Sequence, residues 1–183
     1  MTASWEEKLE FLSRSSADPK APSGRSLLDH LVKMHGLLKS WNSRPALCDA
    51  GLFHSIYSTE LSHDPAIPLA EREAVRNLIG PEAEHLAWLF CVVESDSFNE
   101  NIFRTKEFRV RDRFEGEMIK LTDQEWRDLL LLTFANALES LPDLSRRIRR
   151  NVRSYLDLLY PLVPLSARNT LDSLRPKWWQ FWR

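Results

Sequence analysis

The sequence predicts an all-α fold with one domain, and three observations lead to this. Apolar residues recur three and four positions apart through most of the chain, which is the period of a helix buried on one face. Prolines separate these segments, whereas only five glycines occur in 183 residues, which disfavours a β-rich fold or a glycine-rich nucleotide loop. No linker divides the chain. We therefore expect a single helical bundle over residues 1–183, with its core at about 23–160.

Five helices are expected in the first half, each opened or closed by a helix-boundary residue. Ser4 and Glu7 form a capping-box pattern, and Pro45 and Pro81 each suit the first turn of a helix. Gly80 is typical of the position just after a helix. The expected helices span residues 4–15, 24 or 25 to 41, 46–56, 69–79, and from 81 onward.

The second half of the sequence predicts one hairpin and further helices. Residues 107–121 alternate apolar and charged side chains about a turn, which indicates a small two-stranded hairpin. Thr122 and Glu125 form a second capping box, which opens a strong helix to Leu141. Another helix is expected from Pro142, and a short one precedes the C-terminus. The expected total is seven or eight helices.

Composition excludes several classes of partner. The formal net charge is -1, so no overall field attracts nucleic acid or an anionic membrane. No apolar run approaches the ~20 residues that span a bilayer. The first residues lack a basic stretch followed by an apolar one, so no signal peptide is expected. Cys48 and Cys91 lie in apolar helical runs, which favours reduced core thiols. We expect a cytoplasmic protein that binds neither membrane nor nucleic acid.

Two histidines lie in the predicted helices, 24 positions apart. His30 follows Ser23-Gly24, and His54 ends a run that is apolar on most sides, from Ala46. Such a helix is buried centrally, so the polar residues at its end need partners. Two interpretations remain open at this point. The histidines are either ligands of one metal ion or core side chains that are hydrogen-bonded inside the bundle.

The order of these motifs resembles the HD-domain superfamily of metallohydrolases, over roughly residues 23–141. The most similar branch is the alarmone hydrolase domain of RelA/SpoT-type proteins. In that pattern a Ser-Gly segment precedes a metal-binding histidine, an apolar helix ends in His-Asp, and a later Leu-Ala-Asp helix supplies the last ligand. Here these positions hold Ser23-Gly24 before His30, then His54-Ser55, and Asn136 within the run 132–137.

The resemblance implies a divalent ion, Fe, Mn or Zn, held by His30 and His54. Ser55 and Asn136 stand where the family has carboxylates, which removes two negative charges that would offset the charge of the ion. Two imidazoles alone bind hard Mn²⁺ or Mg²⁺ poorly, because those ions prefer oxygen donors. We therefore do not expect this chain to hydrolyse alarmones by the mechanism of the family.

The resemblance also suggests roles for the residues around the histidines. Tyr57 and Glu60 are the expected proton-transfer groups, with Glu60 also a candidate fourth ligand. Arg25, near the mouth of the site, is expected to contact a phosphate, and Ser55 and Asn136 are expected to face the substrate.

Two functions of different class follow. The first is a metal-dependent hydrolase or oxygenase that acts on a small polar or phosphorylated molecule. The second is a catalytically silent HD-like scaffold for ligand sensing or protein association. The tail at residues 176–183 holds three of the seven tryptophans, and we expect it to fold back on the bundle or to cover the partner in a homodimer.

Overall fold

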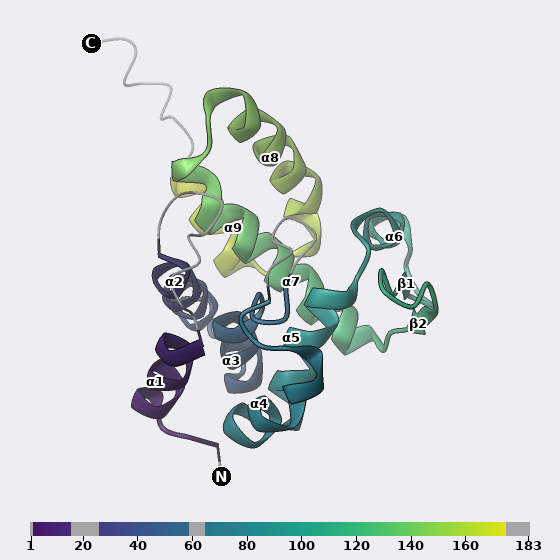
Figure 1. The fold of residues 1–183 in the computed structure, drawn as a ribbon. Helices are drawn as coiled ribbons and strands as arrows, with labels where there is room; N and C mark the ends of the chain where they lie inside the picture. Colours follow the sequence, from purple (N-terminus) through teal and green to yellow (C-terminus); the bar gives the residue numbers. More distant parts are fainter. Residues whose placement is uncertain (1, 16–25, 59–64, 175–183) are drawn as a thin grey trace, which may run out of the picture.

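The computed structural model describes residues 2–15, 26–58 and 65–174, and within these it is built almost entirely of helices (Figure 1). Nine α-helices and one two-stranded antiparallel sheet occur in these ranges, so the predicted all-α fold with a small hairpin is confirmed. The helices are α1 (Trp5–Ser15), α2 (Leu27–Ser40), α3 (Pro45–Phe53), α4 (Arg72–Ile79), α5 (Pro81–Val92), α6 (Ser95–Glu100), α7 (Asp123–Ser140), α8 (Arg146–Leu159) and α9 (Leu165–Ser173). The strands are β1 (Arg109–Arg111) and β2 (Met118–Lys120).

The helix boundaries follow the predicted caps closely. Both capping boxes are present: the backbone N–H of Ser4 donates to Glu7, and that of Thr122 donates to Glu125, each at 2.7 Å. Two boundaries differ from the prediction. The helix expected over 46–56 ends at Phe53, because the chain turns directly after it. The helix expected from Pro142 begins later, because Pro142 lies in a 3-10 turn that precedes α8.

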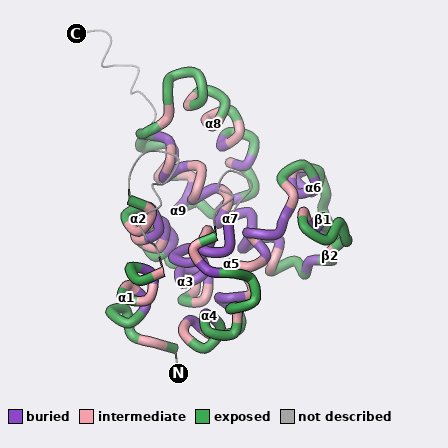
Figure 2. Tube along the Cα trace, viewed as in Figure 1, coloured by how far each residue is buried: buried purple, intermediate pink, exposed green. Residues whose placement is uncertain are grey.

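The centre of the bundle is formed by α2, α3, α5 and α7. The helix α3 packs against α2 and α5, and α7 packs against α2 and α5. One apolar cluster lies among α1 to α5, and a second lies among α2, α3 and the helices from α5 onward. Figure 2 shows the buried residues gathered along α3, α5 and α7, while α1, α4 and α8 present exposed outer faces. The helices α2 and α3 therefore take part in both clusters.

The helix α1 is attached to this centre by a buried ion pair as well as by apolar packing. The ammonium group of Lys8 donates to both carboxylate oxygens of Asp49 in α3, each at 2.8 Å. Both side chains are about nine-tenths buried. A charge removed from water at this depth is stabilised only by its partner. Removing either side chain would therefore leave the other charge buried and unpaired.

A small lobe made of α6, β1 and β2 stands at one side of the bundle (Figure 1). The strands pair with Arg109 opposite Lys120, Val110 opposite Ile119, and Arg111 opposite Met118. The buried amide of Asn101 anchors this lobe, because it accepts a bond from the backbone N–H of Arg109 and donates to the carbonyl of the same residue.

None of the helices in the described ranges is both long enough and apolar enough to cross a membrane. Cys48 and Cys91 are buried free thiols, as the sequence predicts.

Two glycines in the central helices make a matched pair for a test of packing. A Cβ added to Gly51 in α3 would lie 2.3 Å from a methyl carbon of Leu38 in α2, whereas one added to Gly36 would meet nothing within 4 Å. We expect Gly51→Ala to lower the free energy of unfolding by about 1–2 kcal/mol, because overpacking outweighs the helix propensity of alanine. Gly36→Ala should raise it by about 0.5–1 kcal/mol. Urea denaturation midpoints at unchanged m-value measure both effects. Equal stability of Gly51→Ala and the wild type would show that Leu38 moves aside without cost.

Candidate functional site

His30 and His54 meet inside the bundle. His30 projects from α2, and His54 follows the last residue of α3. Their Nε2 atoms lie 3.3 Å apart, and the two rings meet edge to face with centroids 5.1 Å apart. His30 is 8% exposed and His54 is 2% exposed, so both imidazoles are removed from bulk water. The pairing of two buried rings through their Nε2 atoms is the central geometric fact of this site.

The Nδ1 atom of each ring also has a partner. Nδ1 of His54 lies 2.8 Å from the carbonyl oxygen of Gly51, and Nδ1 of His30 lies 2.6 Å from Oε2 of Glu139 in α7. The side chain of Glu139 is only 4% exposed. Gly51, His54, His30 and Glu139 thus form one buried series of hydrogen bonds, which we call the histidine network.

The partners decide where the protons lie in the histidine network. The carbonyl of Gly51 only accepts, so His54 donates from Nδ1 and, when neutral, accepts at Nε2. His30 must then donate from its Nε2. Nδ1 of His30 then faces the carboxyl of Glu139.

The surroundings keep His54 neutral. Burial is the largest cause that lowers the pKa of His54, followed by the nearby His30, and the value falls to about 3. Hydrogen bonds to Gly51 and to the side chain of Asn136 act in the opposite direction but are weaker. Asn136 lies on α7, one helical turn before Glu139. The structure therefore brings together three of the residues that the sequence singles out: His30, His54 and Asn136.

The other predicted site residues have different surroundings. The Oγ atom of Ser55 is buried and has no hydrogen-bond partner among the described residues. The hydroxyl of Tyr57 donates to Glu84 Oε1 at 3.1 Å, not to either histidine. Arg25 and Glu60 lie outside the described residues, as does the aromatic tail at 176–183. Ser55 therefore follows His54 in the chain with a hydroxyl that no described residue bonds, and Tyr57 belongs to another cluster.

Glu84 forms the centre of that second cluster. Its carboxylate is fully buried and accepts from Arg72 Nε at 2.6 Å and from Arg76 at 3.4 Å. The Arg72 guanidinium also lies over the ring of Trp88, 4.4 Å from its centroid. Burial, and next the charge of Glu84, raise the pKa of Tyr57 well above its ordinary value. The phenol of Tyr57 thus stays protonated and acts as a donor that holds a buried carboxylate.

Glu139 is the residue of the network that sequence reasoning missed. An acidic residue at its position is unremarkable in a chain with 26 Asp and Glu residues. One signal was present, because Glu139 lies three positions after Asn136 and therefore faces the same way on a helix. Only the packing of α7 against α2 shows that this face meets His30.

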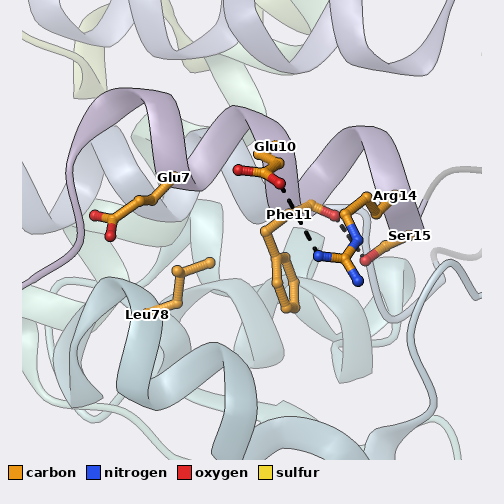
Figure 3. A pocket seen from close by; sticks show the side chains of 6 residues that line it. All are labelled: Glu7, Glu10, Phe11, Arg14, Ser15 and Leu78. Carbon is orange, nitrogen blue, oxygen red and sulfur yellow. Dashed lines mark hydrogen bonds and ion pairs between the residues drawn. The ribbon is translucent and has the colours of Figure 1, made fainter.

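Two hollows are present elsewhere on the described surface. One, of about 600 Å³, lies between α1 and α4, with Phe11 and Leu78 as its apolar part and Glu7, Glu10 and Arg14 around them (Figure 3). The other, of about 450 Å³, lies between the start of α3, α7 and the segment at 162–164. Neither includes a residue of the histidine network, which is a buried polar site within the bundle.

Because the pKa of His54 lies far below the ordinary value of 6.5, stability should depend on pH. The unfolded chain binds a proton at His54 as the pH falls below about 6.5, whereas the folded chain resists it down to about 3. The free energy of unfolding is therefore highest above pH 6.5, where His54 is neutral in both states, and it decreases as the pH falls below 6.5. We expect the wild type to lose about 2 kcal/mol between pH 6.5 and 5 that His54→Gln does not lose.

Urea denaturation of both proteins at pH 7 and pH 5 measures this difference. His85→Gln is the matched control, because His85 is a half-exposed histidine that bonds to Glu125 at 2.9 Å outside the network. It should keep the pH dependence of the wild type. The same pH dependence in His54→Gln as in the wild type would contradict the neutral, buried state of His54.

Comparison with known proteins gives one match. Residues 11–95 match the model of a family described as Domain of unknown function (DUF6817), which is less than half of the chain. This segment contains His30 and His54 but ends before α7, which carries Asn136 and Glu139. No curated protein and no solved structure matches the sequence.

Proposed function

We propose that this chain is a divergent HD-like domain that binds one divalent transition-metal ion between His30 and His54, and that it acts as a metal-dependent hydrolase on a small polar molecule. One observation carries this proposal: two buried imidazoles point their Nε2 atoms at a common point, while each Nδ1 is held by an acceptor. Histidine ligands of metals typically have this second hydrogen bond, because it fixes the tautomer and the orientation of the ring.

The spacing of the two nitrogens fits a shared ion. Two bonds of ~2.0–2.1 Å that meet at a tetrahedral angle place their nitrogens about 3.3–3.4 Å apart. The Nε2 atoms of His30 and His54 lie 3.3 Å apart. An ion would replace the proton that His30 otherwise donates to His54, and both Nδ1 partners could stay as they are.

The remaining donors favour a borderline ion over a hard one. Within the described ranges, no group of three or more His, Cys, Asp and Glu residues is arranged around a common metal position. Among the described residues, Asn136 offers a further donor because its side chain bonds to His54, and Ser55 has a buried hydroxyl with no hydrogen-bond partner. Imidazoles suit Zn²⁺ and Fe²⁺, whereas Mg²⁺ requires more oxygen ligands. We therefore expect Zn²⁺ or Fe²⁺.

The resemblance to HD domains supports the choice of reaction class. Its three motif positions come from α2, from the end of α3 and from α7, and their side chains lie together in one place. An ion bound there would supply a Lewis acid and would lower the pKa of a bound water. In this chain His30 and His54 would hold the ion, Glu139 would orient His30, and Ser55 and Asn136 would offer polar contacts to a substrate.

A catalytically silent scaffold is the second candidate, and one observation favours it. The histidine network is complete without an ion, because all four ring nitrogens of His30 and His54 have a partner. Such a network stabilises a bundle by satisfying buried polar groups. In this case the fold would serve ligand sensing or protein association, and the network would be purely structural.

Metal analysis of the purified chain distinguishes the two candidates. The wild type should carry about one ion per chain after loading with Zn²⁺, since two preoriented imidazoles form the centre of a zinc site. His30→Ala and His54→Ala should each lose it. His85→Ala should keep it, although His85 is also paired with a carboxylate. Substoichiometric metal in a folded wild type would refute the enzyme proposal and leave the scaffold.

Glu139 offers a graded test of the same site. Glu139→Ala removes the acceptor behind His30 and should weaken Zn²⁺ binding by about 10–100-fold. Glu139→Gln keeps an acceptor oxygen and should lie between Glu139→Ala and the wild type. Competition with a chromophoric chelator measures the dissociation constants. Zn²⁺ affinity that is unchanged in Glu139→Ala would place the ion away from His30.

A further inference from the structure

A separate feature of the molecule is the uneven distribution of charge along the chain. Residues 1–140 carry 16 Lys and Arg residues against 23 Asp and Glu residues, a net charge of -7. Residues 141–183 carry nine against three, a net charge of +6, and eight of these nine cations are arginines. The overall charge of -1 therefore conceals a strongly basic C-terminal part. Such an asymmetry indicates an interaction with an anionic polymer or surface.

The helix α8 carries most of these cations. Its 14 residues include five arginines and one acidic residue, Asp157, in the last turn. Over the wider described segment 141–174, six arginines stand against three acidic residues. The first turn of α8 holds three arginines and no acidic residue, although the helix dipole favours negative charge there. The dipole therefore disfavours this arrangement in the isolated molecule, and an external anion would offset the cost.

Two of the five arginines of α8 bind other parts of the chain. Arg149 donates to three backbone carbonyls in the segment 141–144, which precedes the helix. Arg153 donates to the carbonyl of Leu174 at 2.8 Å. Carbonyl oxygens bear no net charge, so both guanidinium groups remain cationic. Arg153 also holds beside α8 the point from which residues 175–183 continue, and these nine residues contain three further cations.

The other three arginines share one exposed side of α8, and we call Arg146, Arg147 and Arg150 the basic face. At 3.6 residues per turn they lie within an arc of about 100°, and Arg146 and Arg150 are about 6 Å apart along the axis. All three are exposed, and none of the salt bridges among the described residues includes them. Figure 2 shows this outer side of α8 as exposed. The basic face thus offers three cations to a partner outside the molecule.

The acidic and apolar neighbours of α8 lie away from the basic face. Tyr155 donates to Asn99 of the acidic helix α6, and it lies about 140° around α8 from Arg150. Ile148 is 50% exposed but lies about 160° around from Arg150. Asp157 is on the same side as Arg150, about 10 Å farther along the axis. Over the first two turns, therefore, the basic face presents positive charge without an apolar side chain.

We propose that the basic face of α8 binds the phosphate backbone of a single-stranded nucleic acid. The planar guanidinium group donates to two phosphate oxygens at once, which makes arginine the cation best suited to phosphate recognition. A lipid surface fits less well, because stable docking on it requires apolar side chains beside the cations. The last nine residues combine their three cations with four aromatic rings. This combination suits a single strand, because its unpaired bases stack on aromatic rings.

The test is fluorescence anisotropy of a short labelled single-stranded RNA, titrated with the full chain at several salt concentrations. Each phosphate contact on a single strand contributes about -0.7 to the slope of log K against log salt concentration. The variant with Arg146→Gln, Arg147→Gln and Arg150→Gln should therefore have a slope shallower by about 2. At about 0.1 M salt it should bind roughly 100-fold more weakly.

The basic-face variant keeps the fold testable. Arg149 and Arg153 stay unchanged because they bond to backbone carbonyls. The variant should be at least as stable as the wild type, because it removes two arginines from the first turn, at the positive end of the helix dipole. Thermal unfolding of both proteins checks this point.

A second triple variant removes the same charge elsewhere and serves as the control. Arg14→Gln with Lys33→Gln and Lys106→Gln removes three exposed cations from α1, α2 and the segment before β1. At about 0.1 M salt, charges farther than ~10 Å from the strand are largely screened. The control should therefore keep the slope of the wild type and bind RNA within about twofold of it.

Three outcomes would overturn the proposal. The first is the absence of RNA binding by the wild type at about 0.1 M salt. The second is an equal loss of affinity in the basic-face variant and the control. The third is tighter binding to vesicles that contain phosphatidylserine than to RNA, which would reassign the basic face to a lipid surface. None of these outcomes depends on metal binding, so the test is independent of the proposed function.

Discussion

The arrangement of the bundle depends on the hydrogen bond between His30 and Glu139, which links α2 to α7. Both groups are buried, and a buried polar group that loses its partner costs far more than the bond contributes when made. The same ring bonds to His54, which in turn bonds to Gly51. The rings of His30 and His54 are held by hydrogen bonds on both of their nitrogens, so rotation of one ring would leave buried polar groups without partners. The network therefore fixes three helices relative to one another.

This constraint matters because apolar packing alone divides the molecule in two. Leu31 of α2 belongs to the cluster beneath α1 and α4, whereas Met34, one turn later, belongs to the cluster around α7. The helix α3 is shared in the same way. Hydrophobic burial is not directional and tolerates small shifts between such clusters. A polar network that crosses the shared helices specifies one alignment, and the close approach of Leu38 to Gly51 reinforces it.

Periodicity and caps predicted most of the helices because these are local properties of the sequence. Thr122 and Glu125 mark the start of α7 without any knowledge of the fold. The meeting of His30 and His54 came from a resemblance between motifs, not from periodicity. The contact of Glu139 with His30 and the hydrogen bond from Tyr57 to Glu84 could not be predicted, because they depend on which helices pack against each other.

The described side chains around the two histidines have a consequence for any charge bound there. Among the described residues, His30, His54 and Asn136 meet at this place, and the carboxyl of Glu139 contacts Nδ1 of His30, not Nε2. With these residues alone, a divalent ion between the rings would keep uncompensated positive charge in a buried place. Burial makes such a charge costly. The affinity for the ion should thus increase when a small anion binds beside it. This dependence should be stronger here than in a site whose ligands include carboxylates.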